Sequence, residues 1–375
     1  MKRKGIHLQY LLDCPGQSGA EIENTVFDLL SSLQAHGSIR RAALARGRSY
    51  RYTWGELKQW EDVLGAELVH WVQGKRAALT PFAQRLLSAE RQARARMTPH
   101  IEALRAELAH VFAQAHDPRH EVLEVFASHD LALPRLQALA TQQQRLHLSL
   151  RFVGSEEALR SLLDGRCNIA GFHVPRLVGG SAMFSQALRP LLRPGLHKLI
   201  GSHSRRQGLM LRHGVKPPTT FRGVADSALR FVNRQSGSGT RLLADHLLCE
   251  AGLKADAIDG YSTRIEHTHV AVAATIAAGA ADVGLGVEAA ARDLGLSFVP
   301  LVEEDYYLVC LKTVLDTTAV QRLRQTLAAP AWHGALTGLA GYAPQRSGEV
   351  LSLTRAIPWW RYRTERRERA LATAE

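Results

Sequence analysis

The spacing of apolar residues along the chain changes near residue 120. Before that point, apolar residues recur every three or four positions, as they do on one face of an amphipathic helix. After it, short apolar runs such as 122–127 and 146–153 alternate with amphipathic stretches. That alternation is typical of strand–helix–strand units around a parallel sheet. The sequence therefore predicts an N-terminal helical region followed by an α/β region.

Three helices and a hairpin are predicted within the first 80 residues. Asn24 is a favourable N-cap for the first helix and Ser38 for a short second one, and a third helix begins near Ser49 after a break at Gly47. Two short helices joined by a glycine turn and followed by a longer helix match the helix-turn-helix arrangement. Apolar residues on both sides of the basic segment 73–76 then predict a hairpin that would form a wing.

Long hydrogen-bond donors gather where this arrangement would meet DNA. They lie at the entrance of the third helix, on its exposed face and at the tip of the hairpin, where they can reach base edges and phosphates. The predicted DNA contacts are Arg46, Arg48, Ser49, Arg51, Tyr52, Lys58, Lys75 and Arg76. The alternative is a generic three-helix bundle with solvated charges, but the order of the features favours double-stranded DNA as a partner.

A long helix is predicted next, over 81–115. Thr80 supplies a capping hydroxyl, Pro81 suits the first helical position, and apolar residues recur at threes and fours as far as Val111. Pro99 is expected to kink or split this helix. The apolar seam favours pairing with a second copy, which predicts a homodimer or a dimer of dimers. The alternative is that the seam packs onto its own chain.

Charge and composition narrow the class of protein. The 375-residue chain is 46% hydrophobic and carries a formal charge of +12, which favours nucleic acid or anionic ligands as partners. No run approaches the roughly 18 apolar residues of a membrane span, and no export signal is evident, so a cytoplasmic location is expected. Ten basic residues and no carboxylate lie between Asp164 and Asp226. This tract is either a solvated face or a field that attracts anions.

The segment 236–241, Ser-Gly-Ser-Gly-Thr-Arg, lies between a predicted strand over 228–232 and a predicted helix. Such a turn leaves backbone N–H groups and hydroxyls at the positive end of the helix dipole, where they can hold an anion. An arginine beside it adds charge-assisted hydrogen bonds. The alternative is a tight glycine turn that binds nothing.

Little in the sequence indicates an enzyme. Ser128, His129 and Asp130 have the residue types of a hydrolase triad, but adjacent residues do not normally adopt its geometry. The four cysteines are scattered without metal-like spacing. Neither a metal nor a cofactor is therefore expected.

Four segments resemble the DNA-binding region of the molybdate-responsive regulators, which are relatives of the LysR-type winged helix-turn-helix. The segments are 37–43, 49–54, 60–65 and 79–87. The resemblance covers about residues 20–115, and the Ser-Tyr-x-x-x-Trp pattern of segment 49–54 is fairly specific. It implies a dimeric transcription factor whose third helix lies in the DNA groove.

The second half resembles the type II periplasmic-binding-protein (PBP) fold, and more narrowly the PBP-like domain found beside molybdate-type helix-turn-helix domains. The segments that carry this resemblance are 206–209, 231–241, 260–261, 268–273, 279–286 and 298–301. Segment 236–241 is also similar to the anion loop of tungstate-binding proteins, whereas 214–217 departs from the relatives. The resemblance covers about 120–345 and implies two lobes around a cleft. The predicted effector contacts are Ser128, Ser155, Arg206, Ser236, Ser238, Gly239, Thr240, Arg241, Thr268 and His269.

The sequence thus predicts an α/β protein with an N-terminal winged-helix domain and a two-lobed PBP-like C-terminal domain. The expected parts are the winged helix-turn-helix at 1–80, a dimerisation helix at 81–115, the PBP-like domain at 120–345 and a basic tail at 346–375. The expected function is a bacterial transcriptional regulator that senses molybdate, tungstate or a molybdopterin-type compound and controls molybdenum-enzyme genes such as formate dehydrogenase. The alternative is a cytoplasmic solute- or cofactor-binding protein with an accessory helical domain.

Overall fold

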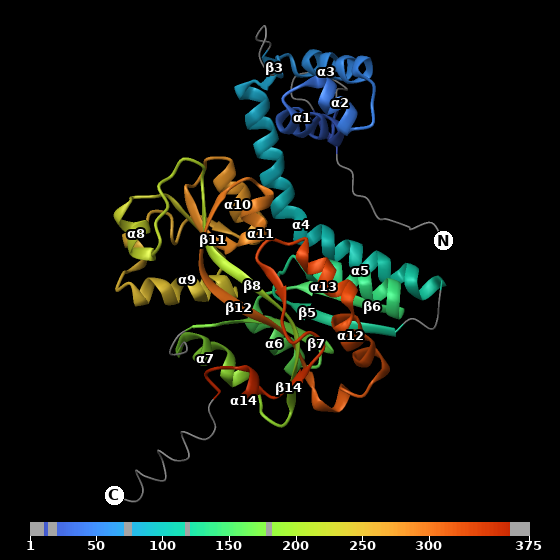
Figure 1. Cartoon of the computed structure of the whole chain (residues 1–375), viewed down its shortest axis with the longest axis vertical. Coiled ribbons are helices and arrows are strands. Elements are labelled where there is room, and N and C mark those ends of the chain that lie inside the picture. The colour runs from blue at the N-terminus through green and yellow to red at the C-terminus, as the bar shows by residue number, and fades with distance from the viewer. Residues whose placement is uncertain (1–10, 14–20, 71–76, 117–120, 178–181, 361–375) are drawn as a thin grey trace, which may run out of the picture. The chain divides into compact units, whose positions relative to one another are not determined.

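The computed structural model describes residues 11–13, 21–70, 77–116, 121–177 and 182–360. The chain divides into two compact units, Met1–Met97 and Thr98–Glu375. Figure 1 labels their helices and strands.

The first unit contains the three predicted helices and the predicted hairpin. Its elements are β1 (Leu11–Asp13), β2 (Glu21–Glu23), α1 (Asn24–His36), α2 (Ile39–Ala45), α3 (Tyr50–Leu64), β3 (Val69–His70), β4 (Ala78–Leu79) and the start of α4 (Pro81–His116). β3 pairs antiparallel with β4, and β1 with β2. The apolar faces of α1, α2 and α3 share one buried core that includes Leu30, Ile39 and Leu57.

Local capping fixes where these helices begin and end. The Ser49 hydroxyl accepts a hydrogen bond from the Tyr52 N–H at 3.1 Å, which satisfies one free donor at the start of α3. Gly65 ends α3 with a φ of 62°, a conformation that costs glycine little. The Thr80 hydroxyl accepts from the Ala83 N–H at 3.2 Å and so caps α4.

Helix α4 runs for 36 residues without a break. The expected split at Pro99 does not occur, because a proline removes one backbone hydrogen bond while the neighbouring turns keep theirs. The alternative expectation, a kink at Pro99, stays a prediction. Several large apolar side chains of α4 are exposed on this chain, with exposed fractions of 39–60%. These are Met97, Leu104, Leu108 and Val111.

The second unit is built on one large mixed sheet. Its strand order is β10-β9-β11-β8-β12-β7-β5-β6, with β13 and β14 added to β8. The strands are β5 (Glu121–Ala127), β6 (Leu146–Phe152), β7 (Ile169–Pro175), β8 (His197–Leu211), β9 (Phe231–Arg234), β10 (Ile265–Glu266), β11 (Val283–Val287), β12 (Ser297–Leu311), β13 (Tyr342–Pro344) and β14 (Val350–Leu351). β5 pairs in parallel with β6 and β7, and β9 pairs in parallel with β10 and β11. The two parallel sets define lobe I and lobe II.

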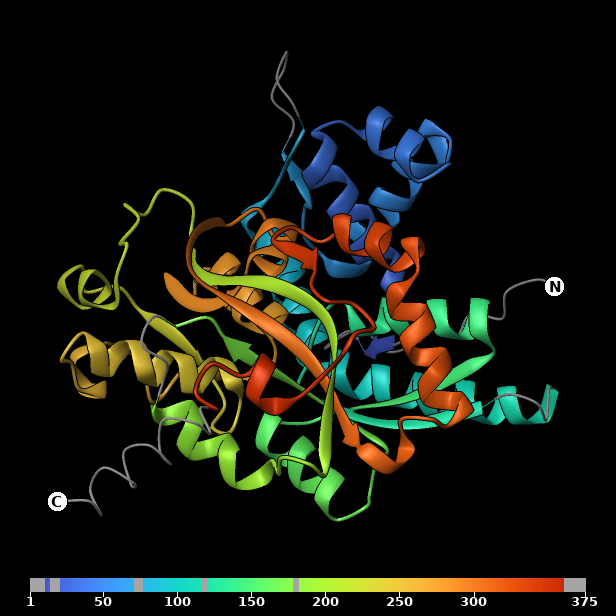
Figure 2. The same cartoon turned by 60° about the horizontal axis from the view of Figure 1, so that its bottom comes forward.

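Two long antiparallel strands, β8 and β12, serve both lobes. In lobe II the second half of β8 pairs with β11 on one side and with the first half of β12 on the other. In lobe I the first half of β8 pairs with β13 and β14, and the second half of β12 pairs with β7. Figure 2 shows these two ribbons running side by side through the unit. The lobes are therefore joined by paired strands.

Helices cover both faces of the sheet. They are α5 (Leu133–Gln144), α6 (Ser155–Leu163), α7 (Ala182–Leu188), α8 (Phe221–Asp226), α9 (Gly239–Glu250), α10 (His269–Ala277), α11 (Glu288–Asp293), α12 (Thr318–Ala328), α13 (Pro330–Thr337) and α14 (Leu353–Ala356). One core extends over both lobes, and two further cores lie on the opposite faces of lobe I and lobe II. The structure confirms the predicted fold class, a helical N-terminal region followed by an α/β region with two lobes.

Two boundaries differ from the predictions. The strand expected over 228–232 begins at Phe231, because Ala228 has a φ of 50° and is not extended. The basic tail expected over 346–375 begins as part of the α/β unit, since Leu353, Ile357 and Trp360 are buried in the core of the second unit. Their burial repays the ordering of this segment. The arginines from position 361 onward lie outside the described residues. No helix among the described residues has the length and hydropathy needed to cross a membrane.

Candidate functional site

The first helix of interest is α3, whose solvent-facing side carries basic and aromatic residues. Arg48, Arg51 and Tyr52 are exposed at the helix entrance, and the Arg48 guanidinium lies 5.0 Å from the centre of the Tyr52 ring. Lys58 lies further along α3, where its ammonium group is 2.6 Å from a Glu61 carboxylate oxygen and remains about half exposed. This surface offers cations and a planar ring to a partner.

One of the predicted DNA contacts, Arg46, is held by a carboxylate of α3. Arg46 makes two hydrogen bonds to the Glu56 carboxylate, at 2.6 and 2.9 Å, and this pairing raises the pKa of Arg46. Its guanidinium therefore ties the end of α2 to α3. Lys75 and Arg76 lie outside the described residues.

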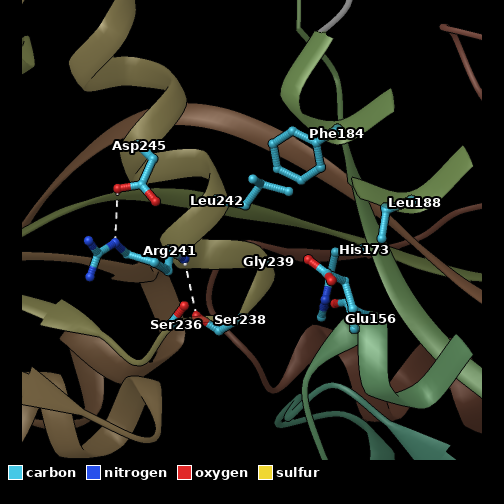
Figure 3. Close-up of a pocket in the computed structure, with 12 residues that line it drawn as sticks. Glu156, His173, Phe184, Leu188, Ser236, Ser238, Gly239, Arg241, Leu242 and Asp245 are labelled. Atoms are coloured by element: carbon cyan, nitrogen blue, oxygen red, sulfur yellow. Dashed lines mark hydrogen bonds and ion pairs between the residues drawn. The ribbon is translucent and has the colours of Figure 1, made fainter. Parts of the chain in front are cut away.

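The second site is a pocket between the strand ends of lobe I and lobe II. It encloses about 140 Å³. Figure 3 shows side chains from α6, β7 and α7 on one side and from the loop and first turns of α9 on the other. The lining residues are Ser155, Glu156, His173, Phe184 and Leu188 from lobe I, and Ser236, Gly237, Ser238, Gly239, Arg241, Leu242 and Asp245 from lobe II. Pockets at the carboxyl ends of parallel strands are the usual ligand sites of α/β sheets.

The two lobes approach each other closely beside this pocket. A β-carbon on Gly154 would lie 2.7 Å from the Gly237 carbonyl oxygen, which is closer than real β-carbons come. A β-carbon on Gly239 would lie 3.4 Å from the Ser155 hydroxyl oxygen. The N-termini of α6 and α9 therefore face the same small space, and each contributes the positive end of its dipole.

The hydroxyl groups near the pocket differ in what they can still bind. Ser238 donates to the Gln235 carbonyl at 2.9 Å and accepts from the Arg241 N–H, so it caps α9. Thr240 accepts from the Gln207 amide at 3.2 Å. Ser155 is 3% exposed, and its hydroxyl has no partner among the described residues. Ser155 is therefore the buried hydroxyl that is left to bind a ligand, and Ser236 is an exposed hydroxyl in the same lining.

Arg241 lines the pocket, but its charge already has a partner. Its Nε donates to Asp245 at 2.9 Å, and its guanidinium lies 5.0 Å from the centre of the Tyr261 ring. The Tyr261 hydroxyl donates to the same Asp245 carboxylate at 2.7 Å. Arg241 is thus half of a neutral pair.

A buried arginine that the sequence analysis did not select lies at the end of β9. Arg234 is 5% exposed and donates one hydrogen bond, to the His267 carbonyl at 2.9 Å, while its Nε has no partner among the described residues. Burial and the nearby Arg205 lower the pKa of Arg234 to about 9, which leaves it charged at neutral pH. The signal in the sequence was an arginine that ends a strand just before the glycine- and serine-rich loop.

Ser128 does not line the pocket, but it contacts His173 of β7, which does. The Ser128 hydroxyl lies 2.9 Å from Nδ1 of His173, and Nε2 of His173 lies 3.4 Å from Asp130. Burial and Arg205 lower the pKa of His173 to about 4, so the ring is neutral at pH 7. In this neutral ring the N–H group is at Nε2 and donates a hydrogen bond to the Asp130 carboxylate, while Nδ1 accepts a hydrogen bond from the Ser128 hydroxyl. A Ser-His-Asp chain therefore exists, but through His173 rather than the adjacent His129.

A buried polar network links this chain to the strands that join the lobes. Arg205 of β8 donates to Asp130 at 2.8 Å and to Glu304 of β12 at 3.0 Å. Gln207 of β8 donates to Glu304 at 2.7 Å and to Thr240 at the start of α9. Hydrogen bonds thus run from the lobe I side of the pocket to the lobe II side.

The remaining predicted effector contacts lie away from the pocket lining. Thr268 is fully buried and its hydroxyl caps α10 by accepting from the Ala271 N–H at 3.0 Å. His269 is also buried, and burial together with Arg234 holds its pKa well below the usual value. Arg206 makes an ion pair with Glu288 at 2.8 Å and is about half exposed.

Half of the ten basic residues between Asp164 and Asp226 form ion pairs with carboxylates in the described part of the chain. Arg176 contacts both Glu303 and Asp305 at 2.6 Å, and Arg212 contacts Asp282 at 2.9 Å. Pairing of this kind neutralises much of the field that the sequence alone indicated, and it favours the interpretation of a surface face.

These features define a class of protein: a two-lobed α/β binding domain with a polar pocket at its strand ends, on one chain with a winged-helix unit. The chain belongs to the family described as the PBP superfamily domain, whose family model matches residues 136–328.

Two bacterial relatives match parts of the chain. The protein YvgK of Bacillus subtilis (strain 168) is 28% identical over 204 residues, which is 54% of this chain and 64% of YvgK. The chain thus spans less than two thirds of that relative. A protein from the 5′ region of the ferredoxin 2Fe-2S gene of Clostridium pasteurianum is 30% identical over 112 residues, 30% of this chain and 98% of that protein.

Solved structures with similar arrangements have low sequence identity. A hydrogen-peroxide-bound OxyR mutant of Corynebacterium glutamicum is 15% identical over 84% of this chain and 96% of that one, with a TM-score of 0.43. Full-length BenM is 15% identical over 81% and 95%, with a TM-score of 0.40. CbnR in complex with its target DNA is 16% identical over 81% and 99%, with a TM-score of 0.37.

Proposed function

We propose that this chain is a one-component transcriptional regulator that binds DNA through α3 and its hairpin and senses a small oxyanion in the pocket. The observation that carries the proposal is the pocket itself. The pocket is lined by two helix N-termini and by the Ser155 hydroxyl, which has no partner among the described residues. The buried Arg234 ends β9 two residues before the lining residue Ser236 and forms no ion pair in the described part of the chain. Each of these features favours a negatively charged ligand.

The size of the pocket bears on the effector. About 140 Å³ is well below the roughly 300–1,000 Å³ of pockets that enclose drug-sized ligands. A single oxyanion such as molybdate or tungstate fits that volume better than an entire molybdopterin-type compound, of which the pocket would take the phosphate group. The resemblance to molybdate-responsive regulators is the support for molybdenum-enzyme genes, for example formate dehydrogenase, as targets.

The exposed face of α3 supports DNA binding. Arg48, Arg51, Tyr52 and Lys58 are the proposed contacts to bases and phosphates, with Lys75 and Arg76 as proposed contacts of the wing. Arg46, held by Glu56, is proposed to position the entrance of α3. We propose that the protein acts in the cytoplasm as a homodimer or a dimer of dimers, with a small anion as its effector and without a metal or cofactor.

A gel-shift assay with promoter DNA from the upstream region of the protein's own gene tests this assignment. Replacing Arg51 and Lys58 together by alanine should weaken binding by roughly 10-fold or more, because each contact contributes about 1–3 kcal/mol. Arg85→Ala, which removes an exposed arginine of α4, is the matched control and should bind as the wild type does. If the double variant keeps full affinity, α3 is not the recognition helix. If the wild type binds no duplex, the alternative of a solute- or cofactor-binding protein is favoured.

A further inference from the structure

One carboxylate of the oxyanion pocket has acceptor positions that no described residue fills. Glu156 lies in the first turn of α6 and lines the pocket beside Ser155 (Figure 3). Among the described residues its ion pair is with Arg160, at 3.9 Å, and its side chain is 39% exposed. Glu156 therefore presents a negative charge to a pocket that we propose takes an anion.

The other lining carboxylate differs from Glu156. Asp245 accepts from the Arg241 guanidinium at 2.9 Å and from the Tyr261 hydroxyl at 2.7 Å. Its charge and one of its oxygens are thus occupied within the protein. An ionised carboxylate can only accept hydrogen bonds, so the oxygens of Glu156 can accept from a donor group on a ligand in the pocket.

Donors lie directly beside this acceptor. Ser155 precedes Glu156, is 3% exposed, and has a hydroxyl without a partner in the described part of the chain. That hydroxyl faces Gly239, the first residue of α9, whose β-carbon would lie 3.4 Å away. The α6 side of the pocket thus offers a hydrogen-bond donor and an acceptor next to each other.

We propose that Glu156 makes this pocket selective for an oxyanion that keeps a proton, namely hydrogen phosphate or a phosphate monoester. The P–OH group donates to Glu156 while the remaining oxygens accept from Ser155 and the helix N-termini. Sulfate, molybdate and tungstate are acceptors throughout at neutral pH, so they would place like charges side by side without a hydrogen bond. A phosphate monoester has its second pKa near 6, so retaining a proton costs it little. This inference rests on the proposed function, because it names the ligand of the same pocket.

Calorimetry on the full-length protein tests the inference with five probes: inorganic phosphate, glycerol phosphate, sulfate, molybdate and tungstate. The wild type should bind one of the two phosphates at least about 10-fold more tightly than sulfate. Glu156→Gln should reduce that ratio about 10-fold, because the amide can donate to sulfate as well as accept. Glu157→Gln changes the neighbouring, exposed glutamate and should leave the ratio unchanged. The two phosphate probes distinguish a free ion from an ester.

The outcomes separate this inference from the proposed function. If the wild type binds sulfate, molybdate or tungstate as tightly as either phosphate, the selectivity is wrong and an oxyanion-sensing regulator still stands. An unchanged ratio in Glu156→Gln, in a variant with wild-type melting and DNA binding, also overturns the inference. If none of the five probes binds, both the inference and the proposed effector class fail, whereas the gel shift still decides DNA binding.

Discussion

At the scale of single residues, charge pairing distinguishes groups that hold the fold from groups that await a ligand. Arg241 and Arg46 each have a carboxylate partner within 3 Å. Arg234 is buried, has no such partner among the described residues, and keeps an unsatisfied Nε. A buried charge without compensation costs folding free energy, and proteins keep such a charge where binding recovers that cost.

Replacing Arg234 by methionine should therefore have two opposite effects. The free energy of unfolding without ligand should rise by roughly 1–3 kcal/mol, because an uncompensated buried charge is removed. The stabilisation that an added oxyanion gives to the wild type should disappear. Thermal melting with and without phosphate or molybdate measures both effects. Arg241→Met is the control, and it should not stabilise the ligand-free protein because it breaks the pair with Asp245.

The lowered pKa of Arg234 predicts how the affinity for an oxyanion depends on pH. Because that pKa is lowered to about 9, the residue loses its charge as the pH rises through 9, whereas an ordinary arginine stays charged. Affinity for molybdate, which has no proton to lose in this range, should therefore be constant between pH 7 and 8 and fall as the pH rises through 9. Affinity that stays level to pH 10 would show that Arg234 does not carry the binding.

The sequence predicted part of this site, and the reason is local. Ser236, Ser238 and Gly239 stand in a glycine- and serine-rich turn between a strand and a helix, a pattern visible without tertiary structure. Glu156 and His173 give no such signal, because their roles depend on neighbours from distant segments. His173, for example, matters through Ser128 and Asp130, which lie more than forty positions earlier in the chain.

At the scale of elements, two glycines allow the lobes to meet. Gly154 lies between the end of β6 at Phe152 and the start of α6, and the loop that leads to α9 contains Gly237. The carbonyl of Gly237 comes so near Gly154 that a side chain at position 154 would displace it. The geometry of the pocket thus depends on the absence of a side chain at this point.

Gly154→Ala should consequently weaken oxyanion binding. The new methyl group must push the loop of α9 away from Ser155, and a shift of this size typically costs about 1–3 kcal/mol. Gly334→Ala in α13 is the matched control, since no atom lies within 4 Å of the added methyl group and alanine stabilises a helix by up to about 1 kcal/mol. Calorimetry and thermal melting should show loss in the first variant and none in the second.

The spacing of apolar residues predicted the order of helices and strands, but it did not predict where each element begins and ends. Helical spacing placed α1 to α3 because these helices bury one face, and short apolar runs placed β5 to β7, of which β5 and β7 have cores on both faces. The predicted start of β9 was wrong, because Ala228 adopts a left-handed conformation and the strand begins only at Phe231. The end of the α/β unit was set too early, because burial of Leu353 and Trp360 depends on packing against residues far away in sequence.

At the scale of the whole molecule, α4 has an apolar face without enough cover on its own chain. Met97, Leu104, Leu108 and Val111 are all more than a third exposed. Pairing with a second copy would bury them, and helix-turn-helix proteins commonly bind two half-sites as dimers. The exposed residues thus support the proposed homodimer.

Carboxylates introduced on the apolar face of α4 should dissociate the proposed homodimer. Leu104→Glu together with Leu108→Glu places two carboxylates in the seam, so sedimentation should change from dimer to monomer and DNA affinity should fall at least 10-fold. Gln84→Glu adds a charge at an exposed position of the same helix and should leave the assembly unchanged. A wild type that sediments as a monomer contradicts the proposed assembly.

The shared strands β8 and β12 limit how the protein can be cut. Each contributes backbone hydrogen bonds to lobe I with one half and to lobe II with the other. A fragment that ends before residue 297 would keep the parallel strands of both lobes but leave one edge of β8 without its neighbour. Bare edges of this kind recruit other chains, so such fragments should aggregate. Excision of an autonomous lobe is therefore ruled out by the path of the chain, and shorter versions suited to biosensors must retain residues 121–311 in one piece.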